Sequence, residues 1–167
     1  MNDEIFMKEA IRLSQLAVSH GNEPFGAVLV KDGEIALGDK INIVVPTGNF
    51  GNILAGFYAK KMGIPVNKLI CASNANNVLT DFLNTGVYNR NRPFHTTISP
   101  SMDILISSNL ERLLYHLSGE NDSQIREWFG ALASKGEYEV SDSVKEMLKE
   151  EFYAGCCDDV QTKECIK

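Results

Sequence analysis

A glycine-rich segment between two apolar stretches carries the residues best suited to binding chemistry. It reads Gly48-Asn49-Phe50-Gly51-Asn52, and it lies between a β-branched stretch and a helical pattern. A turn of this kind exposes backbone N–H groups at the positive end of a helix dipole, which favours a bound anion. Gly48 and Gly51 lack Cβ atoms and let a ligand approach the backbone. Asn49 and Asn52 can donate side-chain amide hydrogens, so the segment predicts an anion cradle.

The spacing of this turn is also compatible with a tight strand-to-helix connection that binds nothing. Neither Gly-Lys-Ser nor Gly-Lys-Thr follows the turn, so it is not the phosphate loop of the P-loop NTPases. It also lacks the Gly-x-Gly-x-x-Gly pattern of dinucleotide-binding folds. The anion cradle and the simple connection therefore both stay open on the residues alone.

The elements that would position the turn are a strand before it and a helix after it. Residues 41–45 are β-branched and almost wholly apolar, as in a strand whose sheet is covered on both faces. Apolar residues from Ile53 to Met62 recur on one helix face, and the pattern stops at Gly63. Residues 68–72 predict the next strand, and a right-handed crossover makes it the parallel neighbour of the first. The predicted fold class is therefore α/β with a partial parallel sheet.

The remaining chain predicts mostly helices. They are expected from Asn76 or Asn77 to Leu83 and over residues 103–117, 122–134 and 142–153, with a short strand at 137–140. Residues 86–102 predict a long ordered loop, in which Ser101 would cap the helix that follows. An N-terminal helix up to residue 20 and a β-hairpin around residues 32–33 complete the pattern. Residues 155–167 show no regular periodicity.

Length and charge exclude several classes of function. A chain of 167 residues allows one domain, or one domain with a short appendage. The net charge of −6 disfavours nucleic acids and anionic membranes as partners. No apolar run approaches the ~20 residues of a membrane span, and the acidic N-terminus lacks the basic flank of a signal peptide. A cytoplasmic location is therefore predicted.

The turn belongs to the first of three longer sequence motifs. The first spans residues 38–63 and contains PTGNFGN, the second is KLICASN at residues 68–74, and the third is SPSMDILISSNLER at residues 99–112. Together they closely resemble bacterial threonine synthase over residues 38–167. That family consists of fold-type-II pyridoxal-phosphate (PLP) enzymes, which convert O-phosphohomoserine and water into threonine and phosphate. The resemblance implies the large domain of that fold, with PLP as cofactor.

In this family the glycine-rich loop holds the phosphate group of the cofactor, which implies cofactor-binding roles for residues 48–52. The family's catalytic lysine, which forms a Schiff base with the cofactor, lies in a His-Gly-Pro-Thr-x-x-Phe-Lys-Asp segment before that loop. This chain has no such segment, and only Lys8, Lys31 and Lys40 precede its loop. The family also continues past the position of Lys167. We therefore assign no catalytic residue and expect a middle fragment that is inactive alone.

Residues 1–37 resemble a different family. The runs MKEAIRL (residues 7–13) and GNEPFGAVLVKDGEI (residues 21–35) are similar to the first helix and hairpin of cytidine- and guanine-type nucleoside deaminases. Those enzymes bind zinc through His-x-Glu and Pro-Cys-x-x-Cys, and neither motif occurs here. No metal site is predicted. The resemblances divide the chain into a deaminase-like helix and hairpin (1–37) and a threonine synthase-like part (38–167), as in a chimera joined near residues 37–40.

Three functions stay open on the sequence. The first is a threonine synthase-like PLP fragment, and the second is a deaminase-like zinc hydrolase, which the missing ligands argue against. The third is a non-catalytic fragment that binds phosphate or a partner. The expected ligand is phosphate or the phosphate group of PLP. Faces left exposed by a truncation would favour self-association.

Overall fold

The computed structural model describes residues 8, 9, 11, 12, 15, 16, 18, 19, 30, 31, 34, 35 and 40–166. The chain divides into two compact units. One contains Met1–Asn42 and Ala55–Asn67, and the other contains Ile43–Leu54 and Lys68–Lys167. The glycine-rich turn belongs to the second unit, which also holds most of the helices.

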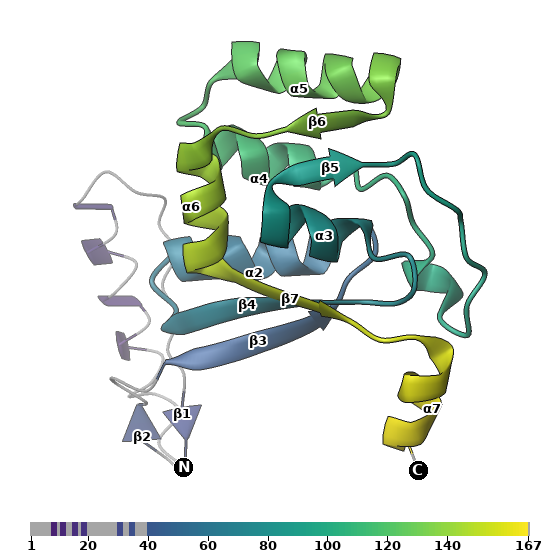
Figure 1. Ribbon diagram of the computed structural model, residues 1–167. Coiled ribbons are helices and arrows are strands. Elements are labelled where there is room, and N and C mark those ends of the chain that lie inside the picture. The colour runs from purple at the N-terminus through teal and green to yellow at the C-terminus, as the bar shows by residue number, and fades with distance from the viewer. Residues whose placement is uncertain are drawn as a thin grey trace. The chain divides into compact units, whose positions relative to one another are not determined.

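A three-stranded sheet carries the turn (Figure 1). Its strands are β3 (Ile41–Pro46), β4 (Val66–Ser73) and β7 (Phe152–Cys156), in the order β3-β4-β7. β4 and β7 pair in parallel, with Leu69 opposite Phe152. The predicted α/β fold with a parallel sheet is confirmed, and so are the strands predicted at residues 41–45 and 68–72.

The sheet buries one face. Leu69 and Cys71 on β4 are completely buried, and Phe152 and Ala154 on β7 point to the same side. Tyr153, between them, is 65% exposed. This alternation follows from the pleat of a strand, and it places the apolar core between the sheet and the helices.

Within residues 40–166 the α-helices are α2 (Gly51–Lys61), α3 (Val78–Thr85), α4 (Leu110–Leu117), α5 (Asp122–Lys135), α6 (Asp142–Glu151) and α7 (Asp159–Ile166). A second, two-stranded sheet joins β5 (Val87–Asn89) to β6 (Glu137–Glu139) in antiparallel pairing. Tyr88 lies opposite Tyr138 there, and their rings stack with centroids 5.4 Å apart. Figure 1 shows α5 beside β6, the second strand of this small sheet. The predicted strand at residues 137–140 is confirmed.

Several predicted boundaries are wrong for the same physical reason, because long-range contacts override local pattern. The helix predicted from residue 103 begins at Leu110, since Asp103 is bound to side chains and backbone of other segments. Ser101 lies in a short 3-10 helix, η1 (Pro100–Met102), and caps nothing. The helix predicted to reach residue 153 ends at Glu151, where pairing with β4 takes over.

The N-terminal predictions are only partly covered by the described residues. Those among residues 8–19 are helical, as expected. Strands β1 (Val30–Lys31) and β2 (Glu34–Ile35) pair antiparallel, as the predicted hairpin requires. The helix cap, the turn at 32–33 and most of the junction near residue 38 lie outside the described residues. The deaminase resemblance stays a prediction, and no described helix is long and apolar enough to cross a membrane.

The start of α5 offers a local stability test. The Asn121 side chain accepts a hydrogen bond from the Gln124 backbone N–H at 3.1 Å. Removing such a cap leaves a helix N–H without an acceptor, so we expect Asn121→Ala to lower the free energy of unfolding by about 0.5–2 kcal/mol. Urea denaturation measures it. Ser141→Ala is the control, because Ser141 precedes α6 without capping it, and an equal loss in both variants would contradict the assignment.

Candidate functional site

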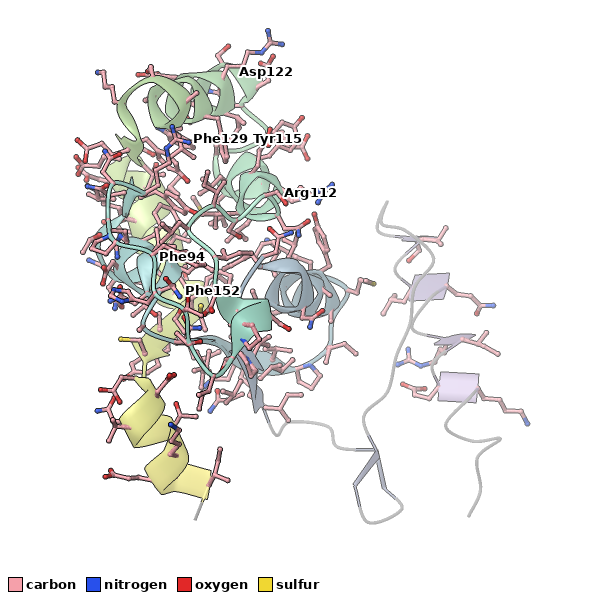
Figure 2. The ribbon with its side chains drawn as sticks, turned by 90° about the vertical axis from the view of Figure 1, so that its right-hand side faces the viewer. Phe94, Arg112, Tyr115, Asp122, Phe129 and Phe152 are labelled. Atoms are coloured by element: carbon pink, nitrogen blue, oxygen red, sulfur yellow. The ribbon has the colours of Figure 1, made fainter. Side chains whose placement is uncertain are left out.

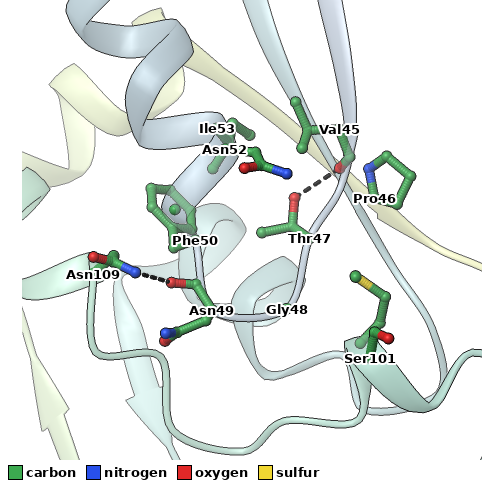
Figure 3. Close-up of a pocket in the computed structure, with 12 residues that line it drawn as sticks. Val45, Pro46, Thr47, Gly48, Asn49, Phe50, Asn52, Ile53, Ser101 and Asn109 are labelled. Carbon is green, nitrogen blue, oxygen red and sulfur yellow. Dashed lines mark hydrogen bonds between the residues drawn. The ribbon is translucent and has the colours of Figure 1, made fainter.

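The glycine-rich turn lines a pocket of about 310 Å³ (Figure 3). One wall consists of residues 45–53, from the end of β3 through the turn to the first residues of α2. Ser101, Met102 and Asn109 form the other wall. The pocket therefore lies where the sequence predicted an anion cradle, and it also involves a second segment of the chain.

Backbone amides at the start of α2 supply the donors of this pocket. The Phe50 carbonyl accepts the first helical hydrogen bond, from the Leu54 N–H at 3.0 Å. Helix geometry leaves the N–H groups of Gly51, Asn52 and Ile53 without acceptors inside the helix. All three residues line the pocket, where the positive end of the helix dipole favours an anion.

The two asparagines of the turn have different surroundings. Figure 3 shows the Asn52 side chain directed into the pocket, toward Thr47. The Asn49 side chain instead accepts hydrogen bonds through Oδ1 from the Ser108 N–H (2.7 Å) and hydroxyl (3.0 Å). The Asn49 backbone oxygen accepts another from Asn109 Nδ2 at 2.9 Å. Asn49 therefore ties the turn to the segment before α4, a role that the sequence did not indicate.

The two glycines also differ. A Cβ atom at Gly48 would lie 2.9 Å from the Ser101 oxygen and 3.3 Å from the Met102 Cα, both backbone atoms. A Cβ atom at Gly51 would meet only Asn109 Nδ2, at an ordinary contact distance of 3.5 Å. Gly48 is therefore needed for the packing of two loops, whereas Gly51 leaves free space beside the helix amides.

Phe50 adopts a left-handed backbone conformation, with φ of 62°. This is uncommon for a residue with a bulky side chain, and it persists only where the surroundings enforce it. The Phe50 ring is buried, and its centroid lies 5.8 Å from that of Phe152 on β7. Packing in the core thus fixes the turn in the conformation that directs its amides to the pocket.

The chemistry of the lining suits a phosphate group. None of the described residues that line the pocket is acidic, so no carboxylate there repels an anion. A metal ion has less support: the described part of the chain contains no group of three or more His, Cys, Asp or Glu residues that could hold one. Cys71 is a buried core residue, and burial raises the pKa of its thiol.

The fold defined by this sheet and turn is that of fold-type-II PLP enzymes, as comparison with solved structures shows. The PLP-bound threonine synthase of Brucella melitensis matches 94% of this chain and 31% of its own, with a TM-score of 0.74 and 35% identity. Yeast threonine synthase matches 75% of this chain and 26% of its own, with a TM-score of 0.71 and 42% identity.

Sequence comparison gives the same result. Human threonine synthase-like 1 is 47% identical over 139 residues, which make up 83% of this chain and 18% of the human protein. Saccharomyces cerevisiae threonine synthase is 43% identical over 137 residues, covering 77% of this chain and 27% of the yeast protein. No family model matches. The chain spans less than a third of these relatives, and it is similar in sequence and fold to a segment of threonine synthase.

Proposed function

We propose that this chain is a threonine synthase-like fragment that binds the phosphate group of PLP, or inorganic phosphate, in the pocket of the glycine-rich turn. The observation that carries the proposal is the set of helix-start amides at Gly51, Asn52 and Ile53, which line a pocket without acidic residues. The similarity to a PLP-bound threonine synthase supports it.

The residues present fit the cofactor's phosphate group. The three amides and the Asn52 side chain would bind it, and Ser101 and Met102 would limit the access of water from the other side. When bound, PLP supplies an electron sink for carbanions of an amino-acid substrate. For the family this substrate is O-phosphohomoserine, which water converts into threonine and phosphate.

Catalysis by this chain alone is not part of the proposal, because its sequence lacks the segment that carries the family's catalytic lysine. We also expect a cytoplasmic location and self-association of the chain. The junction with a deaminase-like segment is also a proposal. Its position near residues 37–40 stays a prediction.

Phosphate titration followed by amide chemical shifts in NMR tests the proposal. We expect shifts at Gly51, Asn52 and Ile53 and an affinity on the order of millimolar, equivalent to about 4 kcal/mol. Gly51→Ala should weaken binding at least about tenfold, because its Cβ occupies the space beside the amides. The protein should remain folded, since the contact at 3.5 Å is ordinary.

Gly130→Ala is the matched control, because Gly130 lies in α5 and a Cβ there meets nothing within 4 Å. It should bind phosphate like the wild type. Wild-type affinity in Gly51→Ala, or an absence of shifts at the start of α2, would show that the turn is only a connection.

A further inference from the structure

A cluster of hydrogen bonds centred on Asp103 lies beside the anion pocket without lining it. Asp103 Oδ1 accepts hydrogen bonds from Asn74 Nδ2 (2.7 Å), Thr97 Oγ1 (2.7 Å) and Asn76 Nδ2 (3.1 Å). Its Oδ2 accepts one from the Thr97 backbone N–H at 3.0 Å. Both carboxylate oxygens are thus used as acceptors, by two separate segments of the chain.

The same cluster fixes the backbone on both sides of Thr97. The Asn76 side chain accepts from the His95 N–H at 2.9 Å and donates to the His95 oxygen at 2.8 Å. Thr97 Oγ1 accepts from the Ser99 N–H at 3.0 Å. Asn74 directly follows β4 and Asn76 lies two residues further on, so these bonds attach residues 95–103 to the end of the parallel sheet.

The attached segment forms one wall of the anion pocket. Ser101 and Met102 line the pocket, and the Ser101 oxygen lies 2.9 Å from the position of a Cβ at Gly48. Apart from the three residues of η1, residues 95–103 have no regular secondary structure. Side-chain hydrogen bonds therefore hold the wall in place, and four of them end on the Asp103 carboxylate. The Ile98 N–H adds a contact to the Asp159 carboxylate of α7.

We propose that Asp103 is a positioning residue, whose carboxylate holds residues 97–102 against the glycine-rich turn and so completes the anion site. This inference rests on the proposed function, because the site is the phosphate pocket described above. The hydrogen bonds from the Thr97 backbone, and then those from the side chains of Thr97, Asn74 and Asn76, hold the pKa of Asp103 below its usual value. The carboxylate therefore remains an acceptor on both oxygens.

Asparagine has the same shape as aspartate but cannot replace it here. Its side chain presents one acceptor and one donor. In one orientation the donor would face the Thr97 N–H, and in the other it would face the donors of Asn74 and Asn76. Asp103→Asn therefore loses at least one bond and places two donors together, which detaches the wall.

The test uses the full chain labelled with ¹⁵N, inorganic phosphate as the probe, and a fixed pH. We expect Asp103→Asn to bind phosphate about tenfold more weakly than the wild type. Without phosphate, the Gly48 and Ser101 amide signals should shift, and the Thr97 amide should exchange its hydrogen faster. Asp122→Asn is the matched control, because Asp122 starts α5 and does not line the pocket. Figure 2 shows it at the top of the view, well above Phe152.

A second control separates positioning from general stability. Asn121→Ala destabilises α5 and should leave phosphate affinity unchanged, whereas a purely structural role of Asp103 would make the two variants alike. Equal affinity in Asp103→Asn and the wild type would overturn the proposal. A wild type that binds no phosphate would refute the proposed function instead. In that case the spectra recorded without phosphate still test the positioning role. If Asp103→Asn left the Thr97 amide exchange rate and the Gly48 chemical shift as in the wild type, the positioning role would be overturned.

Discussion

Replacing Gly48 with alanine is expected to abolish measurable phosphate binding and to destabilise the fold. The added Cβ would lie 2.9 Å from the Ser101 oxygen, closer than non-bonded carbon and oxygen atoms approach, and 3.3 Å from the Met102 Cα. Both are backbone atoms, so no rotamer change relieves the contact. One of the two loops must move, and overpacking of this kind costs about 1–3 kcal/mol.

Phosphate binding is lost whichever of the two loops moves. If residues 99–103 move, the pocket loses its second wall, and if the turn moves, the helix-start amides no longer converge. Phosphate titration by NMR and urea denaturation measure the two effects. Gly51→Ala is the informative comparison, because it should weaken binding while keeping the unfolding midpoint. Wild-type stability and affinity in Gly48→Ala would show that the contact between the loops is not rigid.

The sequence predicted the parts of this site that depend on local pattern. Residues 41–45 and the helix after the turn follow from β-branched composition and helical spacing, and the structure places β3 and α2 there. Glycine and asparagine at residues 48–52 predicted a turn with exposed amides. The pocket lies at that turn, and its occupation by phosphate stays a prediction.

The parts that escaped prediction depend on residues distant in the chain. The Asn49 side-chain oxygen accepts hydrogen bonds from Ser108, 59 positions away, and so connects the two loops. The local pattern around Asp103 predicts the start of a helix. In the structure its carboxylate instead accepts a hydrogen bond from Asn74, 29 positions away. Such contacts carry no periodic signal, so a single sequence does not reveal them.

The strand β7 shows the same competition between local and long-range preference. The apolar spacing of α6 continues to Phe152 and Tyr153, which favoured a longer helix. Pairing with β4 places Phe152 opposite Leu69 and buries its ring beside Phe50. The energy of burying an aromatic ring exceeds the small helical preference of two residues, so the sheet determines the outcome.

Phe152→Ala is expected to give the largest loss of stability in this set, about 3–5 kcal/mol. The side chain is 5% exposed and packs beside the buried ring of Phe50. Truncation leaves a cavity under the turn and removes the contact that supports the left-handed backbone of Phe50. Phosphate affinity should therefore fall together with the free energy of unfolding.

The neighbouring residue provides the control for Phe152. Tyr153 is on the same strand, is also aromatic and is 65% exposed on the other face of the sheet. Tyr153→Ala should lower the free energy of unfolding by less than about 1 kcal/mol and leave phosphate binding unchanged, because it opens no cavity. Urea denaturation of both variants, with phosphate titration below their unfolding transitions, measures the difference. Equal losses in the two would mean that the ring of Phe152 does not support the turn, and that the conformation of Phe50 is set by the loop at residues 108–109 instead.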